Sequence, residues 1–454
     1  MLWLRNVLVS AVGVGTCLVC VGTAGAQVAG ARPAIDPQQL ADRVQAEVAE
    51  LRGLPFKEHV QAENQSVAAF GEFLDDELER SIPPAIAEHY GEIVRKLGLY
   101  RGPADLDLRT LMKAVMTSQV AAYYDPDKKA FFVLVQGMAE AGMGAVYSHE
   151  LYHGLQDQYF DLDAYMLDKQ RERSLDDDEL LARQAVVEGE ATYVMALWEF
   201  KHTLGSVPAR PVMKEVVRLQ ANVDAATLRK ALELPSAAAL LGGEFANALA
   251  AIDDIPDFIL DTMMSAYLKG MSFVFEVHGG GWSEVEKLYR EAPPASTEQI
   301  LHPEKWFARE YPVKIAWPTF TANPLFARWE LLEQNVLGEF QMGIVFREHG
   351  LGADGAATAG WDGDRYAVLK RRDSDQLLLL WYTTWDTEAD ALEFAQSYRR
   401  LLTVKYADGA DPTRVSQNGR DVLIVEGGDE ASADAFLRFV KSANKTRAGN
   451  RPAR

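Results

Sequence analysis

The chain has 454 residues, of which 46 are Lys or Arg and 66 are Asp or Glu, so its formal net charge is −20 at neutral pH. A net charge of this sign and size argues against nucleic acid and anionic lipid surfaces as partners. The length and a hydrophobic content of 48% suit two or three domains with a large core.

An export signal is predicted at the start of the chain. Residues 1–26 contain one cation followed by the apolar run VLVSAVGVGTCLVCVGTA, and they end in the small residues AGA. We expect cleavage before Gln27 and an exported protein, periplasmic or extracellular, with no membrane span after signal cleavage. A retained membrane anchor and lipid attachment at Cys17 or Cys20 are the alternatives.

The two cysteines also restrict the metal chemistry. Cys17 and Cys20 both lie in the predicted signal, so the mature chain would have no thiol and no disulfide. Any transition metal must then be held by histidine and carboxylate side chains.

Helix signals dominate the segment after the signal. Asp36 is a plausible N-cap, Pro37 suits the first helical position and Gly53 suits the stop, which predicts a helix over 37–52. Further helices are expected over the ranges 67–80, 84–97, 107–116 and 180–200, around the segment SHELYHGLQDQYFDL at 148–162, and on to about Tyr289. Between these helices, VAAYYDPDKKAFFVLVQ contains two β-rich runs around a turn and predicts a hairpin.

The pattern changes after Trp317. Strands are predicted over 365–371, 376–385, 414–419 and 420–427, with helices over 387–402 and 432–441. The first of these helices has a plausible capping pair in Thr387 and Asp390, and a weak echo between EADALEF and SADAFLRF hints at a duplicated ββα unit.

Together these patterns predict an α+β protein with four segments. The signal peptide covers 1–26, and a mainly helical domain with a small β-hairpin covers 27–322. A C-terminal α+β domain covers 323–443, and a disordered tail covers 444–454.

The sequence HELYH places His149 and His153 four residues apart. On a helix, side chains four apart project from nearly the same side, so both imidazoles can reach one zinc ion at about 2.0–2.1 Å. Glu150 is turned by about 100° from His149 and can act on a water without binding the metal. The alternative is that both histidines are hydrogen-bonded core residues of an ordinary helix.

A catalytic zinc site needs a third protein ligand. The apolar segment AVVEGEATYVM offers Glu188, and a buried carboxylate is costly unless it is paired or bound to a metal. Glu190 is the competitor, but two residues further on it points to a different face of the helix. We therefore predict one Zn²⁺ per chain, held by His149, His153 and Glu188.

These motifs resemble the gluzincin zinc peptidases, in which a glutamate from a second helix completes an HExxH site. VEGEA is similar to the NEGFA-type segment of the zinc aminopeptidases, and YLKG at 267–270 resembles their YEKG segment. The resemblance implies that Tyr267 donates to the oxyanion of the reaction intermediate; a helix-packing role is the alternative. The gap between His153 and Glu188 is longer than in that branch, and its GAMEN-like segment is missing. HELYHGLQDQYFDL, PPASTEQILHPEKW and GWDGDR also resemble an uncharacterised group of secreted bacterial metallopeptidases.

Four weaker candidates have ordinary structural alternatives. Asp157 could orient a ligand imidazole or lie at a solvated helix end, and His302 could be a second transition-state donor or part of a turn before Pro303. Asp362-Gly363-Asp364 invites a calcium interpretation but is better explained as a turn. The strand AFFVLV could pair with an extended peptide or be an ordinary sheet strand.

The sequence therefore predicts an exported zinc metallopeptidase acting on a peptide or protein substrate, with Glu150 as proton carrier. The alternatives are a secreted binding or scaffold protein that retains a non-catalytic zinc site, and a zinc hydrolase of a non-peptide amide. The sequence does not indicate an oligomeric state.

Overall fold

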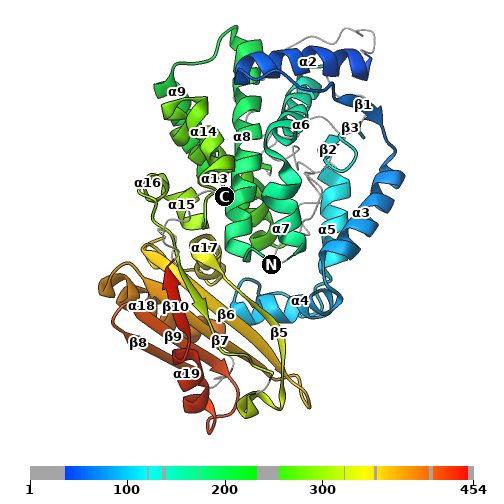
Figure 1. The fold of residues 1–454 in the computed structure, drawn as a ribbon. Helices are drawn as coiled ribbons and strands as arrows, with labels where there is room; N and C mark the ends of the chain where they lie inside the picture. The colour runs from blue at the N-terminus through cyan, green and yellow to red at the C-terminus, as the bar shows by residue number, and fades with distance from the viewer. Residues whose placement is uncertain are drawn as a thin grey trace. The chain divides into compact units, whose positions relative to one another are not determined.

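The computed structural model describes residues 36–119, 122–134, 140–172, 174–232, 255–321, 323–351, 355–407, 409 and 413–447. The predicted signal segment lies outside these residues. The chain is mixed α+β, as expected, and its residues divide into two compact units (Figure 1). The first comprises the described residues up to Ile82, Arg109–Leu175 and Leu180–Pro293. The second comprises Pro83–Leu108, Asp176–Glu179 and the residues from Pro294, so it begins earlier than the expected boundary at 322/323.

The first unit is mainly helical, with a small sheet. Its helices are α2 (Pro37–Arg52), α3 (Val67–Ser81), α5 (Leu108–Gln119), α6 (Glu140–Phe160), α7 (Asp168–Arg171), α8 (Asp177–Leu204), α9 (Arg210–Ala221), α10 (Ala225–Leu232), α13 (Asp257–Val277) and α14 (Trp282–Arg290), α5 and α8 each starting in the second unit. A π-helical turn at Asp163–Leu167 separates α6 from α7, and a 3-10 turn at His278–Gly280 separates α13 from α14.

The predicted end signals of α2 are confirmed. The side chain of Asp36 accepts a hydrogen bond from the backbone N–H of Gln38, and Pro37 occupies the first position. Gly53 ends the helix in the left-handed region at φ 73°, which glycine adopts without strain.

The predicted hairpin forms strands β2 (Ala122–Asp125) and β3 (Ala130–Val133). A further strand, β1 (Gln61–Asn64), pairs with β3 in parallel, so the sheet order is β1-β3-β2. Because β3 is flanked on both sides, its backbone has no open edge for an extended peptide, and the ordinary sheet interpretation of AFFVLV is correct.

Helices α6 and α8 form the centre of the first unit. Residues 145–157 of α6 and 185–197 of α8 are buried almost without interruption, whichever face of the helix they occupy. Their apolar side chains pack with those of α2 and the small sheet in one cluster that includes Val44, Tyr124, Leu151 and Trp198. A helix that is buried all round must satisfy its polar side chains internally, and both helices carry histidine or glutamate in this stretch.

The second unit contains a five-stranded antiparallel sheet of order β5-β6-β7-β9-β8. Its strands are β5 (Trp329–Asn335), β6 (Trp361–Arg371), β7 (Leu377–Trp385), β8 (Thr413–Asn418) and β9 (Asp421–Gly427). Its helices are α4 (Pro84–Leu97), α15 (Thr297–Leu301), α16 (Pro303–Phe307), α17 (Gly338–Glu348), α18 (Glu388–Lys405) and α19 (Ala433–Lys441), with a 3-10 turn at Pro324–Phe326. The order β6-β7-α18 followed by β8-β9-α19 repeats a ββα unit, and the capping box of Thr387 and Asp390 is present.

Two expectations for this unit are wrong. Residues Asn444–Arg447 do not belong to a disordered tail: they form β10, which pairs antiparallel with β4 (Val313–Ala316). Asp362 and Asp364 lie within β6, where the register shifts between Trp361 and Gly363, and not in a turn. Gly363 stands at this register shift, and a glycine inside a strand often marks such an irregularity, so Asp-Gly-Asp resembled a turn in the sequence although the strand continues.

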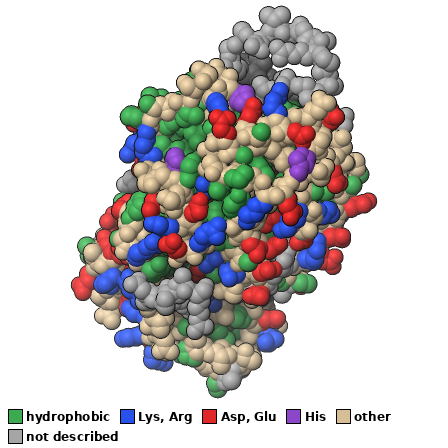
Figure 2. Space-filling model, turned by 45° about the horizontal axis from the view of Figure 1, so that its top comes forward, with side chains coloured by type: hydrophobic (Ala, Val, Ile, Leu, Met, Phe, Trp, Pro, Cys, Tyr) green, Lys and Arg blue, Asp and Glu red, His purple; other side chains and the backbone are tan. Residues whose placement is uncertain are grey.

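Among the described residues, no helix combines the length and apolar content that crossing a membrane requires. On the face drawn in Figure 2, acidic and basic side chains are interspersed. Neither sign of charge forms a single block on that face.

Candidate functional site

The two histidines of HELYH project from the same side of α6. The Nε2 atoms of His149 and His153 are 3.1 Å apart, and the two rings are nearly perpendicular, at 82°. Both residues are buried. Their spacing of four along the helix thus directs both Nε2 atoms toward one point, as the sequence predicts.

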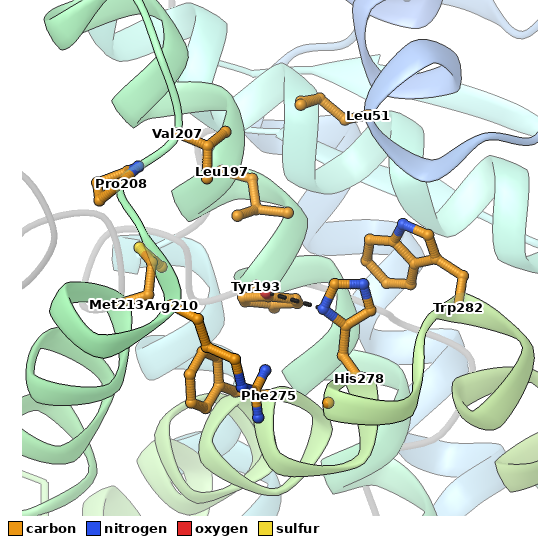
Figure 3. Close-up of a pocket in the computed structure, with 11 residues that line it drawn as sticks. Leu51, Tyr193, Leu197, Val207, Pro208, Arg210, Met213, Phe275, His278 and Trp282 are labelled. Atoms are coloured by element: carbon orange, nitrogen blue, oxygen red, sulfur yellow. Dashed lines mark hydrogen bonds between the residues drawn. The ribbon is translucent and has the colours of Figure 1, made fainter.

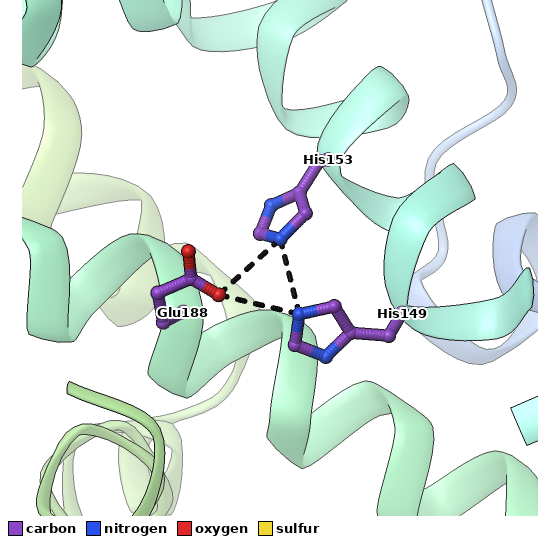
Figure 4. Close-up of side chains that lie close together, drawn as sticks. All are labelled: His149, His153 and Glu188. Atoms are coloured by element: carbon purple, nitrogen blue, oxygen red, sulfur yellow. Dashed lines mark hydrogen bonds and ion pairs between the residues drawn. The ribbon is translucent and has the colours of Figure 1, made fainter. Parts of the chain in front are cut away.

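Glu188 of α8 reaches the same point. Its Oε2 lies 3.2 Å from Nε2 of His149 and 3.4 Å from Nε2 of His153, so the three atoms form a nearly equilateral triangle (Figure 4). Ligand atoms bound tetrahedrally to Zn²⁺ at about 2.0–2.1 Å are about 3.3 Å from one another. The donor set and its spacing therefore fit one zinc ion.

Glu190 does not take part in this triangle. Its Oε1 accepts from Nε of Arg52 at 3.1 Å, and its Oε2 accepts from the hydroxyl of Tyr289 at 2.6 Å. The separation of Glu188 and Glu190 follows from helix geometry, since residues two apart are about 200° apart around the axis.

The charges at the site favour a cation. Burial lowers the pKa of His149 to about 4, against the opposing effect of Glu188, so its imidazole is neutral near pH 7. Burial would raise the pKa of Glu188, but His153 and His149 lower it to about 2. Burial also opposes charge on His153, yet Glu188 and Glu150 raise its pKa overall. A carboxylate and neutral imidazole are the forms that bind metal.

Glu150 lies on α6 beside the triangle. It is buried, and its Oε2 accepts a hydrogen bond from the backbone N–H of Tyr124 in β2 at 3.1 Å. This hydrogen bond fixes the carboxylate against the small sheet. The negative charge of Glu150 also contributes to raising the pKa of His153. Glu150 is outside the group of side chains whose atoms converge as ligands.

Tyr267 of α13 packs against His149. Its ring is stacked against the imidazole, with centroids 5.9 Å apart and an angle of 26° between the planes. The structure therefore brings all five predicted site residues together: His149, Glu150, His153, Glu188 and Tyr267.

Two glycines set how closely α8 and α13 approach. A Cβ on Gly189 would lie 2.1 Å from the carbonyl carbon of Gly270, and a Cβ on Gly270 would lie 2.1 Å from the carbonyl oxygen of Ala185. The backbones are in direct contact at this crossing. Gly189 adjoins Glu188, and Gly270 is three residues after Tyr267, so the crossing fixes where these two side chains stand.

Replacing Gly270 with alanine should destabilise the first unit. The added methyl group meets backbone and not a flexible side chain, so the helices must separate, at a cost of about 1–3 kcal/mol in the free energy of unfolding. Urea unfolding measures this cost. Gly71→Ala in α3 is the control, because its Cβ would meet only the side chain of Lys113 at 3.7 Å and alanine is the better helix former. Equal stability of the two variants would contradict the close crossing.

Gln156 is a site residue that no sequence motif indicated. Its Oε1 lies 2.7 Å from Nδ1 of His153. Gln156 therefore makes the contact with the imidazole that the sequence suggested for Asp157. Asp157 instead accepts from the hydroxyl of Tyr124 at 2.8 Å and from Nζ of Lys129 at 2.7 Å. The orienting role of Asp157 is therefore wrong, although its solvated alternative is wrong too, since the side chain is buried.

A second group of carboxylates, in the second unit, already has its cation. Glu298, Glu310 and Asp386 converge, but Nζ of Lys305 lies 2.5, 2.9 and 2.5 Å from their oxygens. An ammonium group thus fills the position that a metal would take. His302 pairs with Glu339 at 3.0 Å in the same unit.

Asp362 and Asp364 of β6 both have protein partners within the second unit. Oδ2 of Asp362 contacts Arg420 at 3.0 Å and also Arg447. Asp364 accepts from the backbone N–H of Gly338 at 2.9 Å and from the indole of Trp381 at 2.9 Å. These contacts replace the calcium interpretation.

A pocket of about 340 Å³ lies further along α8 and α13 (Figure 3). It is lined by Tyr193, Leu197, Phe275, His278 and Trp282 among others, and the hydroxyl of Tyr193 is 3.1 Å from Nδ1 of His278. None of the five predicted site residues lines it. The pocket and the triangle of His149, His153 and Glu188 are thus separate features of the first unit.

Comparison with known proteins bears on the second unit only. Residues 328–437 match a family model described as a domain of unknown function, DUF8575. No curated protein and no solved structure matches the chain. The matched range runs from the start of β5 into α19, within the predicted C-terminal α+β domain.

Proposed function

We propose that the protein is an exported zinc-dependent metallopeptidase of gluzincin type, acting on peptide or protein substrates. The observation that carries the proposal is the triangle of His149 Nε2, His153 Nε2 and Glu188 Oε2, assembled from an HExxH helix and a second helix. These three residues would hold one Zn²⁺ per chain. Bound zinc polarises a carbonyl group and lowers the pKa of a coordinated water to about 7.

The chain's own residues then have distinct tasks. Glu150 takes a proton from the attacking water and passes it to the nitrogen of the leaving amine. The backbone N–H of Tyr124 holds its carboxylate in place during this transfer. The hydroxyl of Tyr267, whose ring is stacked beside His149, donates a hydrogen bond to the oxyanion that forms at the attacked carbonyl.

Digestion of a peptide library by the purified protein tests the proposal. Cut peptides that disappear after zinc removal and return with added zinc would support it. An intact library with a full zinc equivalent would point instead to a non-peptide amide or to the second candidate below. N-terminal sequencing of the exported protein, expected to begin at Gln27, tests the location.

The second candidate is a secreted binding or scaffold protein whose zinc site is structural. The burial of the site favours it, because none of His149, Glu150, His153 and Glu188 is more than 2% exposed. A peptide must reach these groups, whereas a structural ion need not be accessible. Loss of zinc would then lower stability without any loss of hydrolysis to measure.

Tyr267→Phe should lower turnover and leave zinc content unchanged. The substitution keeps the ring against His149 and removes one oxyanion donor, at a cost of about 10²–10³ in kcat. Kinetics on a cleaved library peptide measure the effect. Tyr193→Phe, which removes a hydroxyl from the separate pocket on α8, serves as the control and should keep the parental kcat. Parental kcat in Tyr267→Phe would leave Tyr267 with only a packing role.

A further inference from the structure

The metal-ligand triangle involves one nitrogen of His153, and the other nitrogen has a fixed partner. Nδ1 of His153 lies 2.7 Å from Oε1 of Gln156, three residues along α6, and both side chains are buried. A neutral imidazole carries its proton on only one nitrogen, and the partner of that nitrogen decides which. The role of Gln156 therefore depends on which way its amide points.

The surroundings of Gln156 determine that direction. Its amide nitrogen lies 3.0 Å from the backbone carbonyl oxygen of Val187 and 3.2 Å from Oε2 of Glu190. A carbonyl and a carboxylate accept hydrogen bonds and cannot donate them, so the NH₂ group must face them. The amide oxygen must then face His153.

We infer that Gln156 is a positioning residue for the metal ligand His153. The amide oxygen can only accept, so Nδ1 of His153 carries the proton and its Nε2 presents a lone pair toward His149 and Glu188. This is the tautomer that a metal needs at Nε2. The inference rests on the proposed metal centre, but it concerns residues that lie outside the ligand set.

The second glutamate of VEGEA supports this arrangement. Glu190 accepts hydrogen bonds from Nε of Arg52 at 3.1 Å and from the hydroxyl of Tyr289 at 2.6 Å. The Tyr289 hydroxyl also lies 2.8 Å from the amide nitrogen of Gln156. Arg52 and Glu190 are both buried. The network joins α2, α8 and α14 to α6, so it keeps an acceptor opposite the Gln156 amide and prevents the amide from turning over.

Zinc titration of Gln156→Met tests the inference. Methionine has a similar length but neither accepts from Nδ1 nor donates to Glu190, so zinc affinity should fall by about 10- to 100-fold, as for other lost outer contacts of a ligand histidine. The matched control is Gln45→Met in α2. The side chain of Gln45 is also buried; it donates a hydrogen bond to the backbone carbonyl of Val60 and accepts one from the backbone N–H of the same residue. Loss of this side chain should therefore lower stability without lowering zinc affinity. Parental affinity in folded Gln156→Met would overturn the inference.

The tautomer of His153 provides a measurement that needs neither zinc nor activity. Two-bond ¹H–¹⁵N correlation spectra of the metal-free parent should show Nδ1 of His153 protonated. An Nδ1 of His153 without a proton would overturn the inference. If the parent binds no zinc, the proposed function fails, while this spectrum still decides the role of Gln156.

Discussion

Glu150→Gln is expected to abolish most peptide hydrolysis while zinc remains bound. The amide cannot take a proton from water at neutral pH, so kcat should fall by about 10²–10⁴, the range for a lost general base. Folding should survive, because an amide oxygen can still accept from the backbone N–H of Tyr124, the contact that Oε2 makes at 3.1 Å. Elemental analysis should find the parental zinc content.

Glu199→Gln is the matched control for this variant, because it makes the same change at another buried glutamate. Glu199 is a buried glutamate of α8, eleven residues beyond Glu188, and it has no place in the proposed chemistry. It should keep parental kcat and zinc content. Full activity of Glu150→Gln with zinc bound would refute the proposed mechanism even if all three ligands were correct. No activity in the parent, with zinc bound, would favour the structural zinc site.

The sequence was sufficient for the parts of the site that depend on helix geometry. Spacing of four placed His149 and His153 on one side of α6, and the 200° between residues two apart separated Glu188 from Glu190. Whether a carboxylate on α8 would meet the histidines at all depends on the crossing of two helices. The apolar surroundings of Glu188 indicated that it needed a partner, but not which one.

The missed contacts join residues distant along the chain. Gln156 is adjacent to Asp157, and nothing in the local sequence decides which of the two faces His153. That choice depends on Glu190, Tyr289 and Arg52, the last of which lies 138 positions from Glu190. A polar residue of a buried helix can be expected to have a partner, but its identity follows from tertiary packing.

The sheets likewise contain strands that local sequence predicts and strands that it does not. The hairpin of β2 and β3 has strong local signals, whereas β1 is a short, mostly exposed polar strand that pairs with β3 across the chain. Strand β10 likewise depends on β4. Short polar strands have little intrinsic preference, so only their pairing partners define them.

Glu188→Ala is expected to remove the tight zinc site and the stability that zinc confers. One of three protein ligands is lost, so affinity should fall by more than the 10- to 100-fold that follows from losing an outer contact. At a zinc concentration about 1,000 times its Kd, the parent should gain about 4 kcal/mol in the free energy of unfolding, and the variant should gain less than about 1.4 kcal/mol. Urea unfolding with and without zinc measures both gains.

The matched control removes a carboxylate from the other convergent acidic group. Glu310→Ala should bind one full equivalent of zinc and show the parental zinc-dependent gain, because Lys305 occupies the centre of that group and no ion is needed there. If Glu310→Ala loses a zinc ion, the chain binds more than one and the second group is a metal site. If Glu188→Ala keeps its zinc and its gain, Glu188 is not a ligand. Because Oε2 of Glu188 lies within 3.4 Å of both imidazole nitrogens, we expect the zinc-dependent gain to depend on Glu188 and not on Glu310.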